Sequence, residues 1–214
     1  MKQLFLCSYL ADIKNLFKSY AADKGLGDHL LFIPTAGNVE EYRDYIDEAK
    51  VVFEDLGFAV EVLDLDQTDQ ETVQAKIFQT KLLYIAGGNS FYLLQELKKK
   101  HLLSLIREQI ADGMVYVGES AGAIITAEGI DYSKLMDNKG VAGELSDTAA
   151  LNEVDFYVLP HAGEEPFAES TQAILDTYRD KLNLLPINNS QAVLVEGEEV
   201  RVWRKINKNA GVVF

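Results

Sequence analysis

The sequence predicts an α/β fold in which a mostly parallel central sheet lies between helices on both faces, a three-layer sandwich. Short apolar runs alternate with longer amphipathic stretches along nearly the whole chain, which is typical of successive β-α-β units. The chain has 214 residues and no internal repeat or low-complexity linker. A chain of this length can bury a full core, so we expect a single domain over residues 1–214.

Strands and helices alternate regularly in the first half of the chain. Apolar runs predict strands at 4–9, 30–34, 58–65 and 82–86. Apolar residues at helical spacing predict helices at 12–22, 40–56 and 70–78. Gly57 is a stop signal after the second of these helices.

The second half keeps this rhythm with one interruption. We expect helices at 90–100, capped by Ser90, and at 102–111, then a strand at 115–117. Residues 131–152 are rich in Gly, Asp and Asn and predict an irregular excursion, and a loop this long is often functional. A strand at 154–159, a helix at 166–182 and a hairpin of 192–195 with 200–204 complete the prediction.

The composition excludes several classes of function. Lys and Arg total 20 against 34 Asp and Glu, a formal net charge of -14, which disfavours nucleic acid and anionic membranes as partners. The amino terminus lacks the pattern of a signal peptide and no apolar run is long enough to span a bilayer, so we expect a cytoplasmic protein. Cys7 is the one cysteine, which excludes an intrachain disulfide and a cysteine metal cluster. We expect Cys7 inside the first strand, where an apolar setting would leave its thiol unactivated.

The segment Gly118-Glu119-Ser120-Ala121-Gly122 follows an apolar strand and precedes a helix of small residues. This order is typical of a nucleophile elbow, in which a sharp turn exposes a serine hydroxyl at the carboxyl edge of the sheet. The alternative is a surface turn that spells G-x-S-x-G by chance. The strand-turn-helix context favours Ser120 as a nucleophile.

A serine nucleophile needs a base to take its proton, and the chain has three histidines. His29 precedes a strand, at the amino edge of the predicted sheet, and His101 lies at a helix end after three lysines. His161 follows the strand at 154–159, so in a parallel sheet it leaves the same edge as Ser120. We therefore expect His161 to be the base, although a lone histidine at a strand end is often only a surface residue.

A tetrahedral intermediate needs backbone N–H donors for its oxyanion. Ala121 follows the nucleophile and would supply one. Gly88, in the turn Gly87-Gly88-Asn89 after the preceding strand, would supply the other. This turn lacks the Lys-Ser/Thr ending of a phosphate-binding loop.

These motifs resemble the peptidase E (aspartyl dipeptidase) family of serine peptidases. The resemblance rests on Gly87-Gly88-Asn89-Ser90-Phe91-Tyr92-Leu93-Leu94, on Gly118-Glu119-Ser120-Ala121-Gly122-Ala123 and on a strand that ends in Pro160-His161. It covers nearly the whole chain, and the family is similar in fold to class I glutamine amidotransferases. It implies a Ser120-His161 pair, an oxyanion hole from Gly88 and Ala121, and a flavodoxin-like α/β sandwich.

The residue that orients the imidazole departs from the family pattern. Relatives of peptidase E carry a glutamate near the strand after the histidine helix, whereas this chain has Ile187-Asn188-Asn189-Ser190-Gln191. Asn189 is the positional match, and its carbonyl can hold a histidine tautomer without stabilising imidazolium by charge. Asp131 and Asp137 are competing candidates in the loop after the elbow. The third position stays open between Asn189 and Asp137.

These residues predict a serine peptidase of the exopeptidase or dipeptidase kind that acts on small peptides without a metal or organic cofactor. The alternatives are a binding or regulatory member that has lost its third triad residue, and a hydrolase of non-peptide amides or esters. Glu164 and Glu165 would repel an acidic side chain and could hold a free α-amino group, or they are the charged first turn of the next helix. Glu119 is either a pocket contact or exposed. A homodimer through the helix around Tyr42 and Tyr45 is possible.

Overall fold

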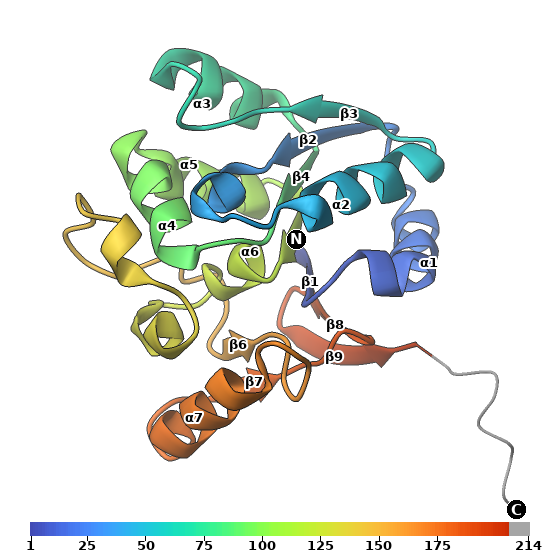
Figure 1. Ribbon diagram of the computed structural model, residues 1–214. Helices are drawn as coiled ribbons and strands as arrows, with labels where there is room; N and C mark the ends of the chain where they lie inside the picture. Colours follow the sequence, from blue (N-terminus) through green and yellow to red (C-terminus); the bar gives the residue numbers. More distant parts are fainter. Residues whose placement is uncertain (206–214) are drawn as a thin grey trace, which may run out of the picture.

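The computed structural model describes residues 1–205, and its centre is a seven-stranded sheet with the order β3-β2-β4-β5-β1-β8-β9 (Figure 1). The strands are β1 (Gln3–Cys7), β2 (His29–Ile33), β3 (Ala59–Val62), β4 (Leu82–Ile85), β5 (Val115–Glu119), β8 (Gln191–Glu196) and β9 (Glu199–Arg204). The strands from β3 to β1 are parallel. The antiparallel pair β8 and β9, the predicted terminal hairpin, completes the sheet beside β1. The predicted mostly parallel sheet is confirmed.

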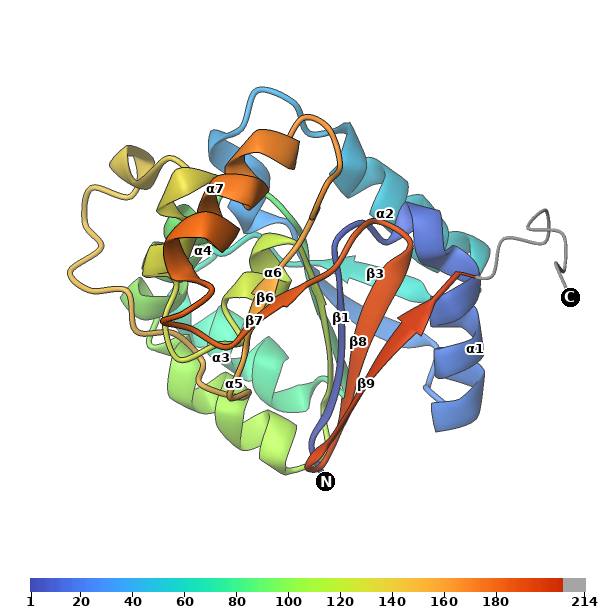
Figure 2. The ribbon, with the colours of Figure 1, turned by 90° about the horizontal axis from the view of Figure 1, so that it is seen from below.

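Helices cover both faces of this sheet, as the view along it shows (Figure 2). On one face lie α1 (Lys14–Lys24) and α2 (Asp44–Asp55); on the other lie α3 (Gln70–Gln79), α4 (Ser90–Lys99), α5 (Leu102–Ala111), α6 (Ala121–Ile124) and α7 (Ala168–Tyr178). Because side chains alternate along a strand, Phe5 and Cys7 of β1 pack under α1 and α2, while Leu4 and Leu6 pack on the opposite side. Cys7 is fully buried, and burial raises the pKa of its thiol well above the ordinary value.

One predicted helix start and one predicted helix cap were wrong. The helix expected from residue 40 begins at Asp44, because Thr35–Val39 forms a short 3-10 helix and the chain extends at Glu40. Tyr42 therefore precedes the helix and is exposed, while Tyr45 lies on the helix, and the homodimer through this region stays a prediction. The cap of α4 is Asn89 rather than Ser90, since the Asn89 Oδ1 accepts the next two N–H groups at 3.1 Å.

The strand predicted at 154–159 was misplaced. Its ordered part, β6 (Tyr157–Leu159), pairs in parallel with β7 (Leu184–Pro186) in a separate two-stranded sheet. It cannot join the central sheet beside β1, because β8 occupies that edge. The sequence analysis missed β7, which has only three residues and ends in a proline.

The irregular excursion predicted at 131–152 is confirmed. It contains two short 3-10 helices, Asp131–Leu135 and Lys139–Val141, and one isolated bridge between Gly129 and Ala149. Tyr132 and Leu151 anchor it to the core. Within residues 1–205, no helix combines the length and the apolar character that crossing a membrane requires.

Candidate active site

Ser120 lies in a sharp turn between β5 and α6. Its backbone has φ 48° and ψ -106°, a conformation that L residues rarely adopt. Two contacts hold this turn: the Ser120 N–H donates to the Cys7 carbonyl at 2.9 Å, and the Tyr116 hydroxyl donates to the Gly122 carbonyl at 2.6 Å. The strand, turn and helix predicted around Ser120 are therefore present, and neighbouring strands hold its strained backbone.

Glycines let other backbone segments approach this turn. A Cβ on Gly118 would lie 2.5 Å from the Gly122 carbonyl oxygen, and a Cβ on Gly122 would lie 2.2 Å from the Ile85 carbonyl oxygen. A Cβ on Gly87 would lie 3.2 Å from the Ser120 Cβ, so the turn after β4 packs directly against the serine. The glycines of both motifs are explained by this close packing.

We expect Gly122→Ala to destabilise the protein by about 1–3 kcal/mol, because its methyl group would collide with rigid backbone of β4. A fall in the urea midpoint of unfolding would measure this. Gly143→Ala is the matched control, because that glycine has no atom within 4 Å of its Cβ position and no positive φ. Equal midpoints for the two variants would contradict the packing argument.

The structure brings the His161 imidazole between Ser120 and Asn189. The His161 Nε2 lies 3.0 Å from the Ser120 Oγ, and its Nδ1 lies 2.9 Å from the Asn189 Oδ1. The Asn189 carbonyl oxygen can only accept, so Nδ1 carries the proton and Nε2 is left as an acceptor for the serine hydroxyl. Phe167 stacks on the ring with centroids 4.7 Å apart, which fixes its plane.

Ser8, which the sequence analysis missed, connects the two sheets at this point. Its hydroxyl accepts the backbone N–H of His161 at 3.1 Å and donates to the Ile187 carbonyl at 3.1 Å. Ser8 directly follows β1, so it leaves the carboxyl edge of the central sheet. A polar residue after a buried apolar run was the available signal.

Burial lowers the pKa of His161 below its ordinary value, and the opposing influences of the Asn189 hydrogen bond and the Glu164 charge are smaller. The imidazole is therefore neutral near pH 7 and can accept a proton. His29 and His101, set aside from the sequence, are exposed: His29 begins β2 and lies 3.1 Å from Asp28, and His101 precedes α5.

The two acidic candidates for orienting His161 make their hydrogen bonds and ion pairs with other residues. Asp137 accepts the Ser90 N–H at 2.9 Å at the start of α4. Asp131 is exposed and pairs with Lys134 at 2.6 Å and Lys139 at 3.8 Å. Of the residues weighed from the sequence for this position, Asn189 is the one in contact with the imidazole.

Gly88 and Ala121, expected from the sequence to form an oxyanion hole, lie near Ser120: Gly88 lines the same cavity, and Ala121 follows the serine in the chain. Within residues 1–205 neither N–H donates to a protein acceptor. Gly88 has φ +126°, and its Cβ position lies 2.4 Å from the Ala36 carbonyl, so only glycine fits there. The next N–H, of Asn89, donates to the Ala36 carbonyl at 2.8 Å, which fixes the turn.

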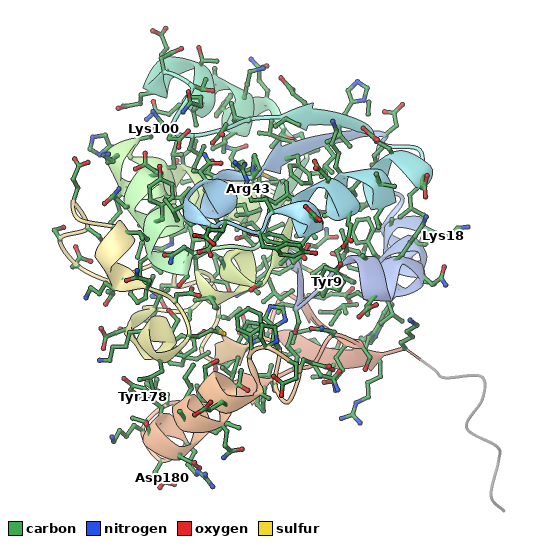
Figure 3. All side chains as sticks on the ribbon, in the orientation of Figure 1. Tyr9, Lys18, Arg43, Lys100, Tyr178 and Asp180 are labelled. Atoms are coloured by element: carbon green, nitrogen blue, oxygen red, sulfur yellow. The ribbon has the colours of Figure 1, made fainter. Side chains whose placement is uncertain are left out.

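These groups open into a cavity of about 560 Å³. Its lining residues come from the ends of β1, β4 and β5, from α2 and from four loops: Ser8, Tyr9, Glu40, Tyr42, Tyr45, Gly87, Gly88, Glu119, Ser120, Met136, Asp137, Asn138, His161, Glu165, Pro166, Phe167 and Asn189. The labelled Tyr9 marks this region below α2 (Figure 3). A larger cavity of about 790 Å³ includes His29 and the opposite ends of the strands, away from Ser120.

Two carboxyl groups in the lining, the buried one of Glu119 and the partly buried one of Asp137, have raised pKa values. Glu119 is buried and accepts a hydrogen bond from the Tyr84 hydroxyl, and burial raises its pKa to about 7. Burial also raises the pKa of Asp137 to about 6. Glu164 does not line the cavity, whereas Glu165 does. Neither belongs to the first turn of α7, which begins at Ala168, so that expectation was wrong.

Known proteins with similar sequences and folds are peptidases. An uncharacterized peptidase of Pasteurella multocida is 44% identical over 92% of this chain and 95% of its own length. Peptidase E of a Nostoc species is 28% identical over 75% of this chain and 65% of its own length. The crystal structure of a Listeria monocytogenes protein that carries a Peptidase E assignment is 41% identical, covers 96% of this chain and all of its own, and has a TM-score of 0.91.

The model of Peptidase family S51 matches residues 5–203, nearly the whole chain. The protein therefore belongs to Peptidase family S51 and is a serine-type peptidase.

Proposed function

We propose that this peptidase hydrolyses short peptides as a dipeptidase or exopeptidase, through an acyl-enzyme on Ser120. The observation that carries the proposal is the continuous contact from the Ser120 Oγ to His161 Nε2, at 3.0 Å, and from Nδ1 to Asn189, at 2.9 Å. A serine, a neutral histidine and a tautomer-fixing acceptor are the parts that acyl transfer needs.

In the proposed reaction the Ser120 oxygen attacks the scissile carbonyl while His161 Nε2 takes its proton. The oxyanion receives the N–H groups of Gly88 and Ala121. His161 then protonates the departing amine, which leaves an ester on Ser120. The same imidazole then takes a proton from water, which attacks the ester. The resulting imidazolium returns this proton to the Ser120 oxygen as the acid product leaves.

The cavity supports a small substrate. Its volume of about 560 Å³ lies within the range of about 300–1,000 Å³ common for small-molecule sites. Relatives called Peptidase E point in the same direction.

Fluorophosphonate labelling and a panel of dipeptides, longer peptides and short esters would test the proposal. We expect labelling at Ser120 and hydrolysis of the short peptides. Labelling with turnover of esters alone would favour the non-peptide hydrolase. A folded protein that neither labels nor hydrolyses any substrate would favour the binding member.

The pH dependence of kcat/KM should report the neutral imidazole. Since burial lowers the His161 pKa, the basic form is lost only below pH 6.5, so activity should fall on the acid side with a midpoint below that value. Asn189→Asp would place a carboxylate beside Nδ1 and raise this pKa by favouring the charged imidazolium, which moves the acid limb to higher pH.

An NMR titration of the imidazole signals would assign this limb to His161 rather than to Asp137 or Glu119. His29→Gln and His101→Gln identify the remaining signal, and both residues lie outside the cavity. An Asn189→Asp enzyme whose His161 pKa is unchanged or lower would contradict the proposed contact.

A further inference from the structure

The cavity around Ser120 is acidic. Four carboxyl-bearing residues line it, and no Lys or Arg does within the described part of the chain: Glu40, Glu119, Asp137 and Glu165. His161 adds no positive charge near pH 7, because burial lowers its pKa. A cavity of this kind attracts cationic groups and repels anionic ones.

Glu40 and Asp137 line this cavity together with the Gly87-Gly88 turn. Asp137 accepts the N–H of Ser90, two residues after Gly88, at 2.9 Å. The Tyr45 ring lies 3.7 Å from the Cβ position of Gly87, next to the same turn. The charge of Glu40 raises the pKa of both Asp137 and Tyr45.

Other lining residues surround His161. Phe167 stacks on the imidazole at 4.7 Å, and Pro166 and Glu165 line the cavity beside Phe167 in the chain. The imidazole that takes the serine proton must also give it to the departing amine. The departing amine therefore lies next to His161, which leaves the rest of the lining, with Asp137 and Glu40, for the acyl part of the substrate.

Asp137 has room for another donor. A carboxylate offers about four acceptor positions, and one of those on Asp137 receives the backbone N–H of Ser90 at 2.9 Å. In a dipeptide the α-amino group is one carbon from the scissile carbonyl. An ammonium group there would lie in the cavity that Asp137 and Glu40 line with Ser120.

We infer that Asp137 and Glu40 bind the protonated α-amino group of the substrate, and that the enzyme selects peptides whose first residue is neutral or basic rather than acidic. This inference rests on the proposed function. It gives the two carboxyl groups a role in substrate choice in place of the orienting role considered for Asp137 from the sequence.

Three dipeptides separate charge from shape: Asn-Leu, Asp-Leu and N-acetyl-Asn-Leu. We expect kcat/KM for Asn-Leu to exceed that for Asp-Leu by about tenfold or more, and that for the acetylated peptide by about 100-fold, because each change opposes or removes a charge contact. Cleavage of Asp-Leu as fast as Asn-Leu, in a reaction lost in Ser120→Ala, overturns the inference alone. Absence of peptide cleavage together with absence of Ser120 labelling overturns it along with the proposed function.

Asp137→Asn keeps an oxygen acceptor for the Ser90 N–H and removes the charge. Its preference for Asn-Leu over the acetylated peptide should fall by about tenfold, and Glu40→Gln, at an exposed residue, should lower the same ratio. Asp131→Asn is the matched control, in the same loop but outside the cavity. A preference unchanged in both Asp137→Asn and Glu40→Gln overturns the inference.

Discussion

Ser120→Ala is expected to lower kcat for short peptides by about 10⁴–10⁶-fold, the largest effect of any single change. Alanine removes the oxygen that would form the proposed acyl-enzyme. The other serine that lines the cavity within residues 1–205 is Ser8, and its hydroxyl already bonds to the backbone N–H of His161 and the carbonyl of Ile187. Steady-state hydrolysis of the best dipeptide would measure the loss. Labelling by fluorophosphonate should disappear with it.

The loss should occur without unfolding. The backbone N–H of residue 120 still donates to the Cys7 carbonyl after this substitution, so the urea midpoint should change little. Ser146→Ala, at an exposed serine outside the cavity, is the matched control and should keep full activity. A Ser120→Ala enzyme that retains activity within tenfold of the wild type would remove Ser120 from the mechanism.

His161→Gln is expected to lower kcat by about 10⁴-fold, because the side chain keeps polar groups near Ser120 but cannot carry a proton to and from it. The rate of fluorophosphonate labelling should fall in parallel, since the serine loses its base. His101→Gln, on the exposed start of α5, should leave both rates unchanged.

The double variant Ser120→Ala with His161→Gln sharpens this test. Residues that act as one unit lose activity together, so the double variant should be about as slow as Ser120→Ala alone. Losses that multiply would show that the two side chains act independently, which would contradict the 3.0 Å contact as the working arrangement.

The sequence predicted the turn at Ser120 well because its signal is local: an apolar strand, a glycine-flanked serine and a helix in immediate succession. His161 was selected for a reason that the structure only partly supports. It does reach Ser120, but from the small β6-β7 sheet rather than from the central sheet. The inference held because both sheets present their strand ends to the same cavity.

The contact of Asn189 with His161, and the presence of Glu40 and Asp137 in one cavity, were harder to predict. Asn189 meets His161 from a segment 28 residues away, and one amide among several in that segment has no local mark. Glu40 and Asp137 come together from two loops whose paths depend on how α2 and α4 pack. Loop positions of this kind follow from tertiary packing, which strand and helix periodicity does not encode.

The junction between the large and small sheets, where Ser8 bonds to the backbone of His161 and Ile187, has a broader consequence. Ser120 follows a strand of the large sheet and His161 follows a strand of the small one, and the hydroxyl of Ser8 spans the junction. In the proposed mechanism the alignment of these two residues thus depends on how the two sheets dock. Substitutions along that junction could tune the turnover rate while leaving both reacting side chains, and the pocket that selects the substrate, untouched.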